Sequence, residues 1–225
     1  MTIMLFGATV AGVAESVNFD DDTIGAPPRG WTLTKTGKGS PKWTVERDDT
    51  APSKGRVLKQ SGQATYPIAL KDGTTIKDGF VEGKFKAISG SEDRAGGLVW
   101  RGRDADNYYV VRANALEDNV VLYKTVKGVR SSLDIVGRKG GYGVKQAVPA
   151  NQWHMLRVEF VGTRFKVIFN DKPLFEVDDS TFTEPGMIGL WTKADSVTAF
   201  DAFGRGPCGI LRGWRSAFVD DNSYH

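Results

Sequence analysis

Three side chains with complementary chemistry recur at even spacing in the short stretch Tyr108–Asn114. Alternate residues of a β-strand point to the same face, so Tyr108, Arg112 and Asn114 would share one surface. An aromatic ring can lie against the apolar C–H face of a sugar, while planar polar groups bind its hydroxyls. We therefore expect a ligand-binding face here. The alternative is a solvated sheet face on which Arg and Lys side chains extend into water.

Aromatic and basic residues on other predicted strands have similar outward positions and could converge with these three. The predicted ligand-binding set is Arg101, Tyr108, Arg112, Asn114, Lys124, Trp191 and Lys193. Trp100 and Tyr109 are expected in the core instead. On this hypothesis, replacing Arg112 by Ala should abolish binding and leave the melting temperature nearly unchanged.

The sequence gives less support to a catalytic site than to this ligand-binding set. Acidic residues occur in pairs in predicted turns, where solvation alone explains them. These pairs are Glu92 and Asp93, Asp104 and Asp106, and Glu117 and Asp118. The chain has two histidines, His154 and His225, and one cysteine, Cys208, which excludes a disulfide framework and an all-histidine or cysteine-based metal site. No G-x-S-x-G motif or plausible Ser/His/Asp set is present.

Short apolar runs separated by turn residues must position these side chains. Four such runs between Ala95 and Ile135 predict an antiparallel meander. Further runs are expected as strands at 31–34, 43–47, 56–60, 66–70, 80–88, 154–160, 164–170, 173–177, 187–191 and 197–203. A spacing of about 8–12 residues, without a convincing helix before residue 204, favours an all-β, two-sheet antiparallel sandwich.

Composition limits the partners. A chain of 225 residues that is 40% hydrophobic can bury one sizeable core. The net charge is only +3, and the basic residues are scattered rather than gathered into the stripe that a phosphate backbone requires, so no nucleic-acid partner is expected. The apolar N-terminal run is too short to span a bilayer, and no membrane partner is expected.

The two ends of the chain differ from its middle. Residues 1–16 are apolar and rich in small residues, which suggests either the remnant of a signal peptide without its positive segment or a first strand. With so little cysteine, we expect a secreted or periplasmic protein. In residues 204–225, Ile210, Leu211, Trp214 and Phe218 recur at helical spacing, so this extension is either a short docked helix or a non-native tail. The domain itself is predicted to cover residues 17–203.

The order of the segments resembles a known pattern. The segments GLVWR, DADNYYVVR, NQWHMLRVEFVGTRFKVIFN and PGMIGLWTKADSVTAFDAF follow one another as in the concanavalin A-like lectin/glucanase jelly rolls. The similarity is greatest to laminin-G-like domains of secreted bacterial proteins, whose relatives include keto-disaccharide hydrolases. The resemblance covers about residues 17–203 and implies a jelly roll. It implies an activity only weakly, since this fold carries many functions.

Two expectations come from the resemblance. Retaining glycosidases of this fold carry an E-x-D-x-E pattern on one strand, which this chain lacks; its nearest segment, Glu176–Asp179, has no second glutamate. Jelly rolls of this class often hold a structural calcium ion between the first and last strands. The predicted calcium ligands are Asp20, Asp22 and Asp201.

The function expected from the sequence is that of an exported, lectin-like domain that binds a glycan or extracellular polysaccharide on its concave sheet. The alternatives are a glycoside hydrolase or other saccharide-active enzyme that uses loop carboxylates, and a structural or adhesive module that contacts proteins. The sequence leaves open which glycan is bound, whether there is turnover, and the oligomeric state.

Overall fold

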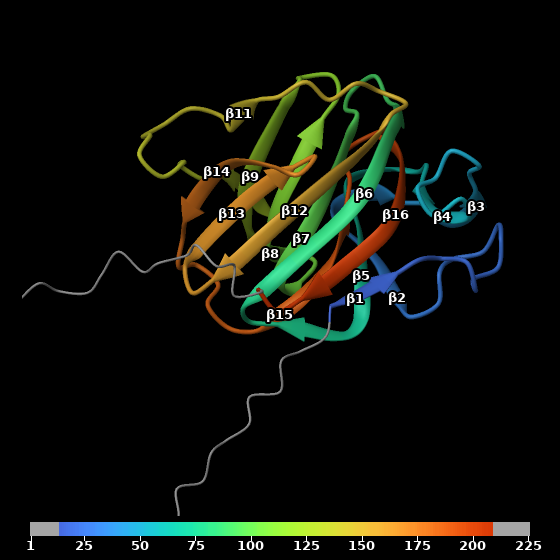
Figure 1. The fold of residues 1–225 in the computed structure, drawn as a ribbon, viewed down its shortest axis with the longest axis horizontal. Coiled ribbons are helices and arrows are strands. Elements are labelled where there is room, and N and C mark those ends of the chain that lie inside the picture. The colour runs from blue at the N-terminus through green and yellow to red at the C-terminus, as the bar shows by residue number, and fades with distance from the viewer. Residues whose placement is uncertain (1–13, 209–225) are drawn as a thin grey trace, which may run out of the picture.

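Residues 14–208 are described by the computed structural model, and they form two antiparallel eight-stranded sheets, sheets A and B. The predicted all-β sandwich is therefore confirmed. In Figure 1, β6, β12, β13, β14 and β16 make the front layer, and β7, β8 and β9 lie behind it.

Sheet A contains, in spatial order, β14 (Lys172–Asp178), β13 (Arg164–Phe169), β12 (Trp153–Val161), β6 (Gly79–Ser89), β16 (Val197–Gly206), β4 (Arg56–Gln60) and β3 (Trp43–Arg47), and β1 (Glu15–Val17) pairs with β16. Sheet B contains β10 (Val129–Ser132), β9 (Asn119–Val126), β8 (Asn107–Asn114), β7 (Ala95–Asp104), β15 (Gly186–Trp191), β5 (Gln63–Ile76) and β2 (Trp31–Ser40), and β11 (Val144–Lys145) pairs with β9.

The strand boundaries extend slightly beyond the predicted domain. β1 begins at Glu15 and β16 ends at Gly206, so the sandwich covers more than residues 17–203. The remainder of the N-terminal segment and the helical spacing that begins at Ile210 lie outside the described residues. No helix among residues 14–208 has the length and apolarity needed to cross a membrane.

The main core fills the space between the two sheets. Trp100 stacks on Tyr109 at a ring-centroid distance of 5.4 Å and meets Phe165 edge-on at 5.4 Å. Tyr109, Val111 and Ala113 of β8 all belong to this core. The alternation predicted for this strand is therefore confirmed on its inner face.

Sheet B buries apolar side chains on its outer face as well. Tyr108 and Val110 of β8 form a second buried cluster with Tyr123 and Trp191. Both faces of β8 are therefore buried, and its central residues, Tyr108–Val111, are all aromatic or apolar, as is typical of a strand covered on both sides.

Strong curvature of sheet B explains why its outer face is buried. The guanidinium carbon of Arg130 on β10 lies 4.8 Å from the ring centroid of Tyr66 on β5. These strands are five places apart in the sheet. A flat sheet would separate them by roughly 24 Å at about 4.8 Å per strand, which is farther than these side chains can span. The outer face of sheet B is therefore a deep concavity, which we call the cup.

Candidate functional site

One end of the cup is closed by contacts between distant strands. The hydroxyl of Thr36 on β2 donates to the carbonyl of Ala105 in the β7–β8 turn, and it lies 2.8 Å from the hydroxyl of Tyr108. Trp191 donates from its indole nitrogen to the same Tyr108 hydroxyl at 3.4 Å. Tyr108 and Trp191 consequently have 1% and 0% of their surface exposed. They lie on the predicted face, but they support the site from beneath rather than presenting their surfaces to a ligand.

Two residues of the predicted set lie on the opposite face of sheet B, so their assignment to the cup was wrong. A bulge after Trp100 gives Arg101 a φ of 47° and turns its side chain inward, over the rings of Phe160 and Phe165. The guanidinium of Arg101 is neutralised there by Asp78 at 3.2 Å.

Lys124 is the second of these residues. It pairs in register with Tyr109, whose ring faces the core, whereas its neighbour Tyr123 points into the cup. The Lys124 ammonium binds Asp179 and Thr181, each at 2.8 Å, at the edge of the sandwich. The alternation of side chains along β9 places Lys124 on the face of sheet B that points toward sheet A. Its predicted position on the cup face was therefore wrong.

The remaining predicted residues meet in a connected group at the open end of the cup, which we call the polar cluster. Its members are Asp93, Arg112, Asn114, Glu117, Asn119, Tyr123, Tyr142 and Lys193. Arg112 is the centre of this cluster. It donates to Glu117 at 2.9 Å and to the hydroxyls of Tyr123 and Tyr142 at 3.1 Å each.

Asn114 connects the two halves of the polar cluster. Its amide nitrogen donates to Asp93 at 2.7 Å and to Glu117 at 3.2 Å, and its amide oxygen accepts the backbone N–H of Leu116. Asp93 in turn pairs with Lys193 at 2.5 Å. Although burial raises the pKa of Glu117, the hydrogen bond from Asn119 and the charge of Arg112 hold that pKa below its usual range. Glu117 is therefore an ionised hydrogen-bond acceptor at neutral pH.

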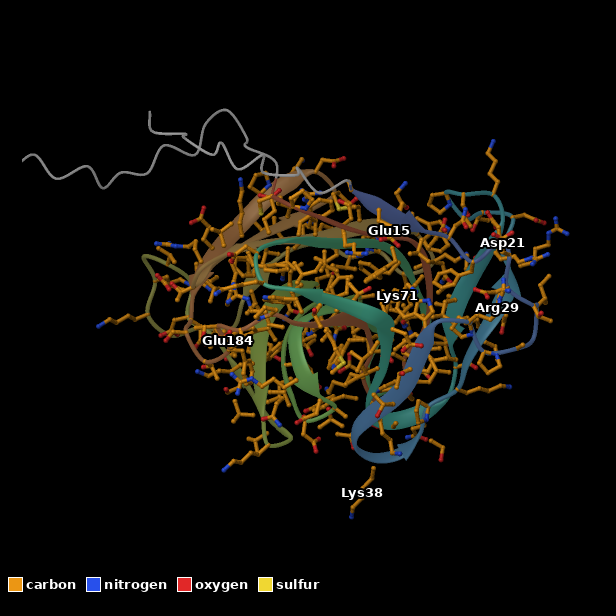
Figure 2. All side chains as sticks on the ribbon, turned by 90° about the horizontal axis from the view of Figure 1, so that it is seen from below. Glu15, Asp21, Arg29, Lys38, Lys71 and Glu184 are labelled. Atoms are coloured by element: carbon orange, nitrogen blue, oxygen red, sulfur yellow. The ribbon has the colours of Figure 1, made fainter. Side chains whose placement is uncertain are left out.

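A pocket of about 420 Å³ opens beside the polar cluster, and Lys38, Tyr66, Glu92 and Lys193 contribute to its lining. Tyr66 stacks on Trp191 at a centroid distance of 5.4 Å, which fixes its ring at the pocket wall. Lys38, one of these lining residues, extends away from the body of the protein (Figure 2). Pockets of about 300–1,000 Å³ that combine an aromatic wall with a few fixed polar groups are typical of small-molecule sites.

Asp195 fixes the loop that carries Glu92 and Asp93. Its carboxylate accepts the backbone N–H groups of Ser91 at 2.7 Å, Glu92 at 3.0 Å and Asp93 at 2.9 Å. The slight burial of Asp195 raises its pKa, but these backbone hydrogen bonds outweigh that effect and lower the pKa far below its usual range. The wall of the pocket is thus held in place by a carboxylate that remains ionised.

The three aspartates predicted to bind calcium have other partners. Asp22 pairs with Arg29 at 3.0 Å. Asp20 accepts the backbone N–H of Arg56, and Asp201 accepts that of Ser53, both on the loop before β4 or at its start. No group of three or more His, Cys, Asp or Glu residues able to hold a metal ion occurs within residues 14–208. Asp20 and Asp201 thus hold the loop before β4, whereas Asp22 holds Arg29 in the loop before β2.

Several functional residues were missed or undervalued from the sequence. Tyr66, Tyr123, Arg130 and Tyr142 come from four separate segments. Pairing of β10 and β11 with β9 brings the last three together, and the curvature of sheet B adds Tyr66 from β5. From the sequence, the turn acids Glu92, Asp93 and Glu117 are weak catalytic candidates or solvated turn residues, and they are not predicted as part of the ligand-binding set. Their positions at the ends of β7 and β8, beside Asn114, were the one available signal. His154, by contrast, is buried against Phe85 and Phe169, within the sandwich.

The two curved antiparallel sheets have the jelly-roll fold that is found in lectins and glucanases. A carbohydrate binding module, CBM66 from Bacillus subtilis, superposes with a TM-score of 0.62 at 23% identity, over 79% of this chain and 95% of that one. The β-glucanase of Bacillus licheniformis superposes with a TM-score of 0.54 at 12% identity, over 89% of this chain and all of that one. These likenesses confirm the predicted jelly roll.

Within this class, residues 25–203 match the profile of the 3-keto-alpha-glucoside-1,2-lyase-like domain, and the chain belongs to that family. The predicted relationship to keto-disaccharide hydrolases is therefore confirmed. The chain is also 28% identical over 162 residues to a levanase of Bacillus subtilis (strain 168). That match covers 72% of this chain but only 20% of the levanase.

Proposed function

We propose that this protein is a carbohydrate-binding domain whose site is the open end of the cup. The observation that carries the proposal is the pocket of about 420 Å³ between Tyr66 and Lys193, next to the polar cluster. The site combines an aromatic surface with donors and acceptors that are already oriented by one another. Sugars require this combination, because each ring has an apolar C–H face and a rim of hydroxyls.

Preorganisation favours binding at this site. Tyr66 is held by Trp191, Glu117 by Arg112 and Asn119, and Lys193 by Asp93. Because these side chains are ordered before a ligand arrives, little further conformational entropy is lost on binding.

The relatives support a saccharide ligand. One structural neighbour is a carbohydrate binding module, and a sequence relative is a levanase. Since the chain corresponds to only a fifth of the levanase, we propose a binding role and make levan the first ligand to test. We also propose that the protein is exported and that it binds its polysaccharide outside the cell.

The ionisation of Glu117 favours binding over hydrolysis. A glycosidase needs a carboxyl group that remains protonated near neutral pH in order to donate to the leaving group. Glu117, at the centre of the polar cluster, has a lowered pKa and does not meet this requirement. We therefore expect retention of a saccharide without release of reducing sugar, although the family is described as lyase-like.

Isothermal titration against levan and a panel of soluble polysaccharides tests the proposal. We expect measurable binding, and a roughly 5- to 30-fold loss of affinity in Tyr66→Ala, as for an aromatic residue at the centre of an interface. Trp153→Ala is the matched control, because Trp153 lies on the outer side of sheet A beside Lys86. Product formation would instead support the enzyme, and binding to no saccharide would leave the adhesive module as the remaining candidate.

A further inference from the structure

Arg130 has an unusual environment on the wall of the cup. Its guanidinium carbon lies 4.1 Å from the ring centroid of Tyr123, 4.8 Å from that of Tyr66 and 5.4 Å from that of Trp191. Stacking on aromatic faces stabilises the cation, and it leaves the N–H groups at the edge of the guanidinium free to donate.

Those N–H groups have no acceptor among residues 14–208. Arg130 forms no ion pair with the described residues, and its Nη1 atom is buried without a hydrogen-bond partner. Of the other arginines that lie over aromatic rings, Arg101, Arg112 and Arg157 each pair with a carboxylate. Arg103, which lies 5.0 Å from the ring centroid of Phe182 and is exposed to solvent, does not pair with one among the described residues. Burying a guanidinium donor without an acceptor is costly, so this geometry is typical of a group whose partner comes from outside the chain.

The charges nearby do not neutralise Arg130. Within the cup, Glu117 is paired with Arg112 and Asp93 is paired with Lys193. Arg112 also lies over Tyr123, at 5.8 Å, so two guanidinium groups share this ring and only one of them has a carboxylate. Lys38 and Glu92, which also line the pocket beside Tyr66, have opposite charges and form no ion pair with the described residues. The charges around the pocket therefore leave the positive charge of Arg130 in excess.

We propose that the cup recognises a saccharide that carries an anionic substituent, and that Arg130 binds this substituent. The inference rests on the proposed glycan-binding function and specifies its ligand class. A planar guanidinium fork matches the oxygens of a carboxylate, and it also binds those of a sulfate ester. Partial exposure of Arg130 leaves its edge accessible to such a group.

Matched pairs of polymers that differ mainly in charge test this assignment by titration. Polygalacturonate against fully methyl-esterified pectin tests the carboxylate, κ-carrageenan against agarose tests the sulfate ester, and levan serves as a neutral reference. We expect the charged member of one pair to bind about 10- to 100-fold more tightly than its neutral partner, as for a hydrogen bond to a charged group. The pair that responds identifies the substituent.

Variants assign the preference to Arg130. Arg130→Gln should remove it, Arg130→Lys should retain part of it, and Arg164→Gln on sheet A should leave it unchanged; melting curves check that each variant is folded. Binding of levan alone, equal binding of neutral and charged polymers, or a preference that survives Arg130→Gln in a folded protein would overturn the inference. Binding to none of the polymers would refute the glycan-binding function itself, and this inference with it.

Discussion

Replacement of Arg112 by Ala is the most informative test of how the site is built. The sequence alone suggested a surface arginine whose loss would affect binding only. In the structure, the side chain is 1% exposed and donates to Glu117, Asn119, Tyr123 and Tyr142. Removing it breaks a charged pair and leaves several polar groups without their donor.

The expected decrease in the free energy of unfolding of Arg112→Ala is large. Breaking a buried ion pair by removing one partner costs about 3–5 kcal/mol. Glu117 is 39% exposed and can be rehydrated, which favours the lower part of that range. For a domain of this size, each kcal/mol lowers the melting temperature by about 2–4 °C, so we expect a decrease of roughly 6–15 °C.

Thermal unfolding followed by circular dichroism measures this effect. Arg164→Ala is the control, because its exposed ion pairs with Glu176 and Asp178 should contribute less than about 1 kcal/mol. A melting temperature for Arg112→Ala within a degree or two of the wild type would refute the buried network described above.

Three further predictions concern stability. Trp100→Ala should destabilise the protein by about 3–5 kcal/mol, because it empties the stacked centre of the core; an unchanged denaturation midpoint would contradict this. Asp195 has a lowered pKa in the folded protein, so its contribution to stability is present above about pH 4 and is lost as the pH falls toward the folded pKa. The stability difference between wild type and Asp195→Asn should accordingly shrink below about pH 4 in acid titrations, and a constant difference would show that the charge is not responsible. Finally, EDTA should leave the melting temperature unchanged, since the three predicted calcium ligands already accept protein hydrogen bonds; a lower midpoint would support the predicted calcium ion instead.

The sequence by itself determined the strands and much of what they bury. Period-two alternation placed Tyr109 and Val111 in the inter-sheet core, and turn residues located β3 and β4 at their observed bounds. These features are local, because the alternation of side chains and the preferences of turn residues depend on the chain within a few positions.

Only the tertiary structure decided which outward residues meet and which of them are accessible. The bulge in β7 turned Arg101 inward, and closure of the cup covered Tyr108 and Trp191. Curvature of sheet B brought Arg130 and Tyr66 together from strands five places apart. Bulges and curvature arise from the packing of a whole sheet against its neighbours, so no short stretch of sequence encodes them.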